Sequence, residues 1–501
     1  MKITQFPLQF AKRSVLVLSV LLALPSLKAA TTTNWNDDTY NNSTYTWEDA
    51  LHWDTGVPTS ASFQPFITHS TGNLTVTTAA AYSVSGASFI VNSGSLTLKL
   101  GGNFAVGYNA SPFAYPLINN TTNNVANLVF DLNDFTLDYR FLSASANVSG
   151  DYFTLASTAA DGKGTAQFGQ VLNGQHLSVQ NNVTLEIINS IGTDFTPSTF
   201  SAGSTLYLSA AGALGMAGGA TTGFGNLIVG NSANANLTYL SMYPYCIARV
   251  VGNLTLNKGT TANQDSYLAF GNSSGKVIVG GNFTDVGGSA TSTVQDFATA
   301  GGGSALIAFN GGAATQRTVS EGRTGLTNNF AVGENTTTPG NIGLAKSLAT
   351  TGSFTMYRGS RLNVAAFTLT AGSLILADDA VGNHLTIADT FGTTNGLITT
   401  SGNLSLNTFN LELTFDGTTW TNGSNLLLFH YGGTFTGTLA LGTITYNGPG
   451  TITSLGTLLN SGGNIYLQGV NVTPVPEPST VFLLMTSFGS LIVWKLRRRK
   501  A

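Results

Sequence analysis

The chain has 501 residues, of which 9% are charged, and a formal net charge of −3. It contains 59 glycines and a single cysteine, so turns are frequent and an internal disulfide is excluded. Nine of the 20 Lys and Arg residues lie at the two ends of the chain. The body keeps eleven basic against 22 acidic residues, which excludes the basic surface that nucleic-acid binding requires.

Residues 1–30 have the pattern of a secretory signal peptide, which would form a helix that is removed from the mature protein. Positive side chains precede an apolar run, at Lys2, Lys12 and Arg13 and at residues 15–24 respectively. Small residues follow the proline that ends this run, and cleavage is expected after Ala29 or Ala30. The general secretory machinery is therefore the first expected partner.

Residues 31–70 are expected to form an N-terminal cap and are rich in tryptophan. Trp47, Trp53, Gly56 and Pro58 follow a Trp-x-x-x-x-x-Trp-x-x-Gly-x-Pro pattern. This pattern resembles the opening segment of exported proteins with autotransporter-associated β-strand repeats. We favour aromatic rings that plug the first coil of a β fold, because such rings bury a large apolar area. The alternative is a sugar-binding platform made of Trp35, Trp47, Trp53, Asp37, Asp38, Asp49 and Asp54.

Residues 71–468 contain short stretches in which apolar and polar residues alternate, a pattern that predicts β-strands. The clearest stretches are 73–76, 95–100, 253–256, 353–356, 373–376 and 403–406. A glycine precedes each stretch, where we expect a turn that needs a positive φ. These glycines are Gly72, Gly94, Gly252, Gly352, Gly372 and Gly402.

The body has no helical periodicity, so the predicted fold class is all-β. Two architectures fit: an elongated right-handed parallel β-helix, or solenoid, with Gly/Asn-rich turns, and a string of β-sandwich domains. We favour the solenoid because the strands share one form and because recurring Asn and Thr suit stacked ladders. Coils of about 22 residues would give on the order of 20 coils and a rod of about 90–100 Å.

The C-terminal segment predicts a linker at 469–478, a short transmembrane helix at 479–494 and a basic cytoplasmic tail at 495–501. The prolines of Val475, Pro476, Glu477 and Pro478 hold an extended peptide around one carboxylate. A helix of 16 residues is about 24 Å long, shorter than the hydrocarbon core of about 30 Å, which suits a transient anchor. The alternative is an ordinary C-terminal membrane anchor that is retained. The basic cluster consists of Lys495, Arg497, Arg498, Arg499 and Lys500.

This order of Pro-Glu-Pro motif, apolar run and basic end resembles the PEP-CTERM sorting tail of exported bacterial proteins. The resemblance covers the tail alone. It implies that the chain is a substrate of an exosortase, a membrane cysteine transpeptidase that cuts near the motif. It also implies a Gram-negative-type bacterium that makes extracellular polysaccharide, with a transient inner-membrane anchor before processing.

The sequence gives little sign of catalytic chemistry. The histidines lack metal-ligand spacing, and Cys246 is expected to be a buried thiol. Asp378, Asp379 and Asp389 surround His384, but adjacent Asp residues are more typical of a solvated turn. The segment 131–134 lacks the spacing of a calcium-binding EF-hand. The scattered histidines are His52, His69, His176, His384 and His430.

We therefore predict a non-enzymatic protein, without cofactor, metal or catalytic residues. Its predicted role is structural or adhesive, at the cell surface, in the outer envelope or in an extracellular matrix, with polysaccharide as a candidate partner. The alternative is a polysaccharide lyase or glycoside hydrolase on a β-helix, which needs converging carboxylates and a basic group in a groove. A passive spacer is a third interpretation.

Overall fold

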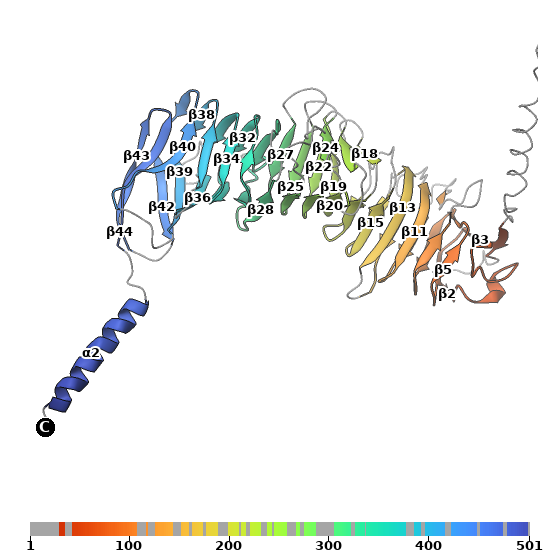
Figure 1. The fold of residues 1–501 in the computed structure, drawn as a ribbon. Helices are drawn as coiled ribbons and strands as arrows, with labels where there is room; N and C mark the ends of the chain where they lie inside the picture. Colours follow the sequence, from red (N-terminus) through yellow and green to blue (C-terminus); the bar gives the residue numbers. More distant parts are fainter. Residues whose placement is uncertain are drawn as a thin grey trace, which may run out of the picture.

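The chain forms an elongated stack of β-coils with a separate C-terminal helix, α2 (Pro478–Arg498) (Figure 1). The computed structural model describes residues 30–35, 43–107, 117–118, 126–143, 152–159, 163–173, 177–188, 199–209, 212–216, 221–231, 238–242, 245–257, 267–270, 275–286, 305–321, 326–335, 337–376, 385–391, 396–415, 422–447, 451–473 and 478–498. The predicted signal helix lies outside this range, apart from Ala30.

Successive coils contribute strands to up to three positions. The first position comes first along the chain in each coil. Among the described residues, its strands form three separate sheets. Its strands are β1 (Thr31–Asn34), β3 (Phe63–His69), β6 (Ser88–Val91) and β9 (Leu117–Ile118); β18 (Gly212–Met216), β21 (Thr238–Met242) and β24 (Tyr267–Phe270); and β31 (Leu348–Ala349), β34 (Thr368–Ala371), β37 (Leu397–Thr400), β40 (Leu426–Tyr431), β43 (Thr451–Ser461) and β44 (Asn464–Thr473).

The second position holds two sheets, one in each half of the stack. Its strands are β2 (Ser43–Thr46), β4 (Asn73–Thr77), β7 (Gly94–Lys99), β10 (Ala126–Asp131), β12 (Tyr152–Ala156), β14 (Leu177–Val179) and β16 (Thr199–Phe200); then β19 (Thr221–Phe224), β22 (Ile247–Val250), β25 (Lys276–Val279), β27 (Leu306–Phe309), β29 (Asn329–Val332), β32 (Ser353–Met356), β35 (Ser373–Leu376), β38 (Leu404–Leu406) and β41 (Phe435–Gly437).

The third position is one continuous sheet of 15 strands. Its strands are β5 (Tyr82–Val84), β8 (Phe104–Val106), β11 (Thr136–Ser143), β13 (Gly164–Asn173), β15 (Val183–Ile187), β17 (Thr205–Leu208), β20 (Asn226–Val229), β23 (Leu254–Leu256), β26 (Phe283–Asp285), β28 (Arg317–Ser320), β30 (Asn341–Leu344), β33 (Arg361–Ala365), β36 (Leu385–Phe391), β39 (Phe409–Phe415) and β42 (Leu441–Asn447).

Apart from the pairs that β44 forms, strands that are neighbours in these sheets are parallel and come from successive coils, as in the pairing of β4 with β7 and of β7 with β10. This pairing confirms the predicted all-β fold with parallel strands, and it excludes a string of antiparallel sandwiches for the described body. All six stretches that the alternating pattern singled out lie within or overlap strands. The right-handed sense of the coil stays a prediction.

The core is a set of apolar columns inside the stack. Leu74, Leu96, Leu128, Phe153 and Leu177 occupy one column in consecutive coils, and all are buried. Side chains alternate along a strand, so each strand buries every second residue and presents the others outward. The period-two pattern of the sequence therefore has its direct cause in this geometry.

The coils are longer than predicted. The 15-stranded sheet runs from Tyr82 to Leu441, so 359 residues cover fourteen steps, or roughly 26 residues a coil. At about 4.8 Å a step, the distance from β5 to β42 is about 67 Å. The prediction of about 20 coils and 90–100 Å was too high because loops between the strands vary in length.

Close approach of the backbone explains most of the glycines before strands. Gly72 and Gly94 have positive φ, 73° and 80°, as predicted. The same prediction was wrong for Gly252, Gly352, Gly372 and Gly402, which do not have positive φ. At these positions the backbone of the preceding coil passes where a side chain would lie.

The column of Gly352, Gly372 and Gly402 shows this constraint. The Gly372 N–H donates to the Gly352 carbonyl over 2.8 Å. A Cβ on Gly372 would lie 1.9 Å from the carbonyl oxygen of Thr351, and one on Gly402 would lie 2.3 Å from that of Gly372. These distances leave no room for any side chain.

Asparagine side chains connect the same corners from coil to coil. The Asn226 Oδ1 accepts from the Asn253 N–H over 2.9 Å, and the Asn253 Oδ1 accepts from the Asn282 N–H over 2.9 Å. The Asn282 Oδ1 accepts in turn from the Thr318 N–H over 2.8 Å. The Asn ladders expected from the sequence are therefore present, and they satisfy backbone donors at the turns.

The C-terminal end closes differently from the rest. β40 pairs with β44 in the antiparallel sense, and β44 pairs with β43 as a hairpin. Gly462 and Gly463 connect the hairpin with φ of 60° and 77°, which a two-residue turn of this kind requires. β44 continues to Thr473, into the segment assigned to the linker.

We expect Gly372→Ala to lower the stability of the chain by about 1–3 kcal/mol, because the added methyl forces two coils apart. Urea unfolding followed by circular dichroism measures the change. Gly223→Ala is the matched control, since a Cβ there meets nothing within 4 Å, and its expected effect is below about 0.5 kcal/mol. Equal midpoints for the two variants would contradict the close-approach explanation.

Candidate functional site

The tryptophans of the N-terminal cap are buried. Trp47, Trp53 and Trp35 expose 0%, 4% and 6% of their surface. The Trp47 ring packs edge-on against Trp53 and against Phe104 of β8, with centroid distances of 4.9 and 5.2 Å. His52, at the end of the short helix η1 (Ala50–His52), stacks on Trp35 at 4.9 Å. The rings therefore plug the first coil, as we favoured.

Hydrogen bonds fix these rings and the adjacent loop. The Trp53 Nε1 donates to the Trp47 carbonyl over 2.8 Å, and the Trp47 Nε1 donates to that of Pro58 over 3.3 Å. The Asp54 carboxylate accepts from the Asn34 N–H and from the Asn34 Nδ2 over 2.8 and 2.7 Å. The hydrogen bond from the Asn34 backbone is the main reason that the pKa of Asp54 is lowered.

The sugar-platform alternative is wrong for these residues. Its three rings offer no exposed face for a pyranose, and Asp54 ties β1 to the loop. Asp49 accepts from the Leu51 N–H over 3.0 Å at the start of η1. Asp37 and Asp38 lie outside the described residues.

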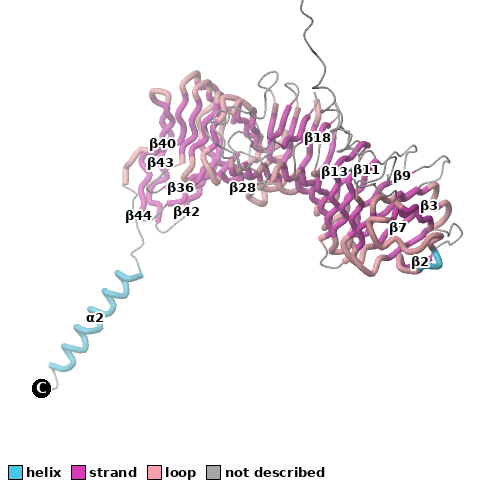
Figure 2. The backbone as a smooth tube through the Cα atoms, turned by 45° about the vertical axis from the view of Figure 1, so that its right-hand side comes forward, coloured by secondary structure: helices cyan, strands magenta, loops and turns pink. Residues whose placement is uncertain are grey.

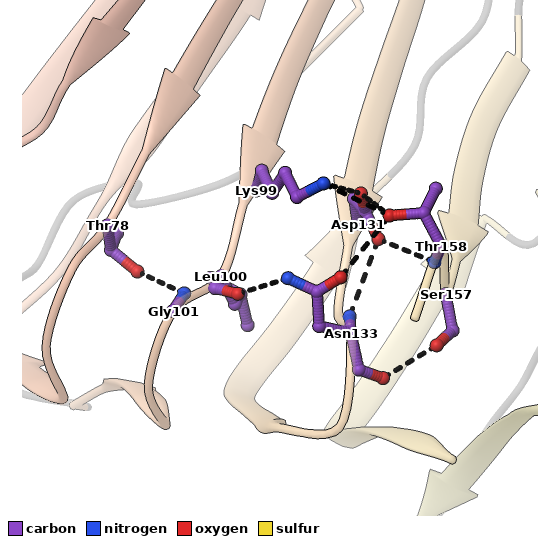
Figure 3. Close-up of polar contacts among 8 residues, drawn as sticks. All are labelled: Thr78, Lys99, Leu100, Gly101, Asp131, Asn133, Ser157 and Thr158. Carbon is purple, nitrogen blue, oxygen red and sulfur yellow. Dashed lines mark hydrogen bonds and ion pairs between the residues drawn. The ribbon is translucent and has the colours of Figure 1, made fainter. Parts of the chain in front are cut away.

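A buried carboxylate organises the corner between the second and third strand positions (Figure 3). Asp131, at the end of β10, exposes 4% of its surface. Its Oδ1 accepts from the Thr158 N–H over 3.0 Å, and its Oδ2 accepts from the Thr158 hydroxyl over 2.5 Å. Lys99 of the preceding coil places its Nζ 3.6 Å from Oδ2.

Asn133 extends this network to both neighbouring coils. Its Nδ2 donates to the Leu100 carbonyl over 2.6 Å, and its own carbonyl accepts from the Ser157 hydroxyl over 2.6 Å (Figure 3). Its φ of 50° is in the left-handed region, which Asn tolerates better than most residues. Both Asp131 oxygens are engaged within the protein, so this corner is a structural junction between coils.

The remaining titratable residues are dispersed. His69 is buried, with its Nε2 3.0 Å from the Gly72 carbonyl oxygen, and the His430 Nδ1 lies 2.8 Å from the Asn464 Oδ1. Cys246 is buried and forms no disulfide, in line with the predicted buried thiol. Among the described residues, no three His, Cys, Asp or Glu side chains lie close enough to hold a metal ion. Asp389 belongs to β36, while His176, His384, Asp378 and Asp379 lie outside the described residues.

An ion pair that the sequence did not indicate lies on the outward side of the second strand position. Arg249 of β22 and Glu334, which follows β29, form a bidentate pair with N–O distances of 2.8 and 2.6 Å. This hydrogen bonding is the main reason that the pKa of Glu334 is lowered and that of Arg249 is raised. The stacking of the coils brings together two residues that are 85 positions apart, and no local sequence pattern predicts such a contact.

A pocket of about 510 Å³ lies beside this pair, at the corner that leads to β28. Arg249, Val251, Ile278, Asn310 and Arg317 are among its lining residues, together with glycines of the turns. It combines two guanidinium groups with aliphatic walls.

The C-terminal tail forms the predicted helix but not the predicted membrane span. In the part of the chain that the structure describes, no helix is long and apolar enough to cross a membrane. Thr486, Ser487 and Ser490 interrupt the apolar run, and their hydroxyls donate to carbonyls of the preceding turn over 2.7–3.0 Å. The transmembrane helix predicted at 479–494 is therefore not found among the described residues.

The sorting motif falls mostly outside the described residues. Val475, Pro476 and Glu477 lie outside, and Pro478 begins α2. Of the basic cluster, Lys495, Arg497 and Arg498 belong to the last turns of α2, and Arg499 and Lys500 lie outside the described part. The proposed cleavage position Ala29 also lies outside, directly before the first described residue, Ala30.

Comparisons with known proteins give no identification. No protein family, no curated protein and no solved structure matches the chain.

We expect Trp47→Ala to destabilise the N-terminal coils by about 3–5 kcal/mol, because a fully buried indole leaves a large cavity. Leu51→Ala in the same segment is the control, since Leu51 is 87% exposed. Thermal unfolding monitored by tryptophan fluorescence compares the two. An unchanged midpoint for Trp47→Ala would show that the rings do not close the stack.

Proposed function

We propose that the chain is an exported surface or matrix protein whose solenoid has a structural or adhesive role and whose C-terminal tail is a sorting signal. The observation that carries this proposal is the exposed apolar surface of α2. The helix stands apart from the solenoid in both views (Figures 1 and 2). Its large apolar side chains are 54–72% exposed, namely Leu483, Leu484, Met485, Phe488, Leu491, Ile492 and Trp494.

An apolar surface of this kind needs a partner outside the solenoid. The Pro-Glu-Pro motif directly before the helix and the basic residues at its end favour an exosortase as that partner. A signal peptide at the other end provides export by the general secretory route. Cleavage near the motif would then separate the solenoid from the tail. The solenoid would reach the cell surface, the outer envelope or the extracellular matrix of a Gram-negative-type bacterium.

The solenoid suits a structural or adhesive role. Thr255, Thr284 and Ser320 are outward neighbours in three successive coils, so hydroxyl groups recur there at a regular spacing. Weak contacts repeated in this way add up along an extended polymer such as a polysaccharide. We take the coil to be right-handed, as nearly all parallel crossovers are.

We expect Glu477→Ala to abolish C-terminal processing, because the substitution removes the single carboxylate of the motif. Intact mass measurement of the protein from the medium and from membranes of the native host tests this. Wild type is expected to lack residues 1–29 or 1–30 and everything beyond about Pro478, whereas the variant keeps its C-terminus.

Pro474→Ala is the matched control, since it changes the same linker and leaves the Pro-Glu-Pro sequence intact. Its processing is expected to equal that of wild type. A wild-type protein with an intact C-terminus, or processing that continues in Glu477→Ala, would contradict the sorting proposal.

A further inference from the structure

The pocket beside Arg249 sits where three successive coils turn from the second strand position to the third. Val250 ends β22 and Val251 follows it, Ile278 lies on the outward side of the next strand, and Asn310 follows the strand after that. Arg317 begins β28 and lines the far side of the pocket. The site is therefore built from four strands, which hold it in a fixed geometry.

One of the two guanidinium groups is already neutralised. Both Glu334 oxygens bind Arg249, and the Asn310 Nδ2 donates to the Glu334 Oε2 over 3.1 Å. The outward residues between the two partners are Ile278, Ala308 and Ala331, all buried, and the two small alanines leave space for the long Arg249 side chain. Arg249 therefore lines the pocket with its charge already paired by Glu334.

The other guanidinium is not neutralised. The Arg317 Nε is buried and has no hydrogen-bond partner, and no carboxylate of the described residues forms an ion pair with Arg317. The described lining of the pocket contains no carboxylate. An arginine side chain keeps its proton and therefore its charge. Its unused N–H donor needs an acceptor. A buried donor without an acceptor costs free energy.

We propose that this pocket binds a small oxyanion-bearing ligand of sugar size, with Arg317 as the anion-binding residue. The planar guanidinium matches the oxygen pair of a carboxylate or a phosphate. Val251 and Ile278 offer aliphatic contacts for the uncharged part of the ligand. The volume of about 510 Å³ is within the usual range for small-molecule sites.

This inference does not depend on the sorting tail. For a surface protein that contacts polysaccharide, such a site favours acidic over neutral chains. The two conclusions have separate readouts, since processing is read from the mass of the chain and the pocket is read from ligand binding.

Ligand-observed NMR with the purified full chain tests the pocket, with glucuronate, glucose 6-phosphate and glucose as probes. We expect at least one acidic probe to bind at least tenfold more tightly than glucose, and more weakly at high salt. Preference for glucuronate identifies a carboxylate ligand, and preference for glucose 6-phosphate identifies a phosphate ligand. Arg317→Gln is expected to weaken binding of the preferred probe at least tenfold.

Lys163→Gln is the control, because it removes the same charge from an exposed position in the other half of the stack. Val251→Glu gives a second test that leaves the core intact, since Val251 lines the pocket and is 59% exposed. Its carboxylate is expected to repel the anion with no change in the unfolding midpoint. Failure of both acidic probes to bind, equal affinity for glucose, or unchanged affinity in Arg317→Gln and Val251→Glu would overturn the proposal.

Discussion

The structure depends on the backbone hydrogen bonds between successive coils. Parallel strands lie about 4.8 Å apart, and this spacing must hold at the corners as well as in the sheets. At the corners a strand ladder is interrupted, so the backbone groups need other partners. Glycines such as Gly372 let the chain of one coil donate directly to the next, and asparagines such as Asn253 supply an acceptor where the backbone does not. The polar, glycine-rich composition is a consequence of this one constraint.

A stack of this kind exposes its interior and its strand edges only at the two ends, and the chain closes each end in its own way. At the N-terminal end, three buried tryptophans plug the first coil, and Asp54 ties the loop that carries Trp47 and Trp53 to β1. At the C-terminal end, the antiparallel hairpin of β43 and β44 extends the first strand position. Between the ends, outward residues lie outside the apolar columns of the interior, and sites such as the Arg317 pocket form there.

The local features of the fold follow from the sequence, and the features that join distant coils do not. Alternation over residues 373–376 predicts the strand, because side chains of a strand point to opposite sides. The role of Gly372 cannot be predicted from the sequence. A glycine can be required by a positive φ or by close approach of another backbone, and the sequence is the same in both cases. The Arg249–Glu334 pair and the pocket depend on which coils are neighbours. Because the loops differ in length, the sequence does not predict which residues of successive coils lie side by side. The helix of the tail was predictable from its apolar run, whereas the predicted membrane span is not found among the described residues.

The most direct test of the stacked parallel register is disulfide formation between cysteines placed on adjacent coils. Thr255 and Thr284 are direct neighbours on β23 and β26, and Thr284 pairs in turn with Ser320 on β28. The only native thiol, Cys246, is buried and does not compete. We predict that Thr255→Cys with Thr284→Cys forms a disulfide under mild oxidation, because parallel neighbours lie within the range that a disulfide bridges. Thr255→Cys with Ser320→Cys is two coils apart, about 9.6 Å, and is predicted to stay reduced. A disulfide in the second pair, or none in the first, would contradict the solenoid register on which the whole account rests.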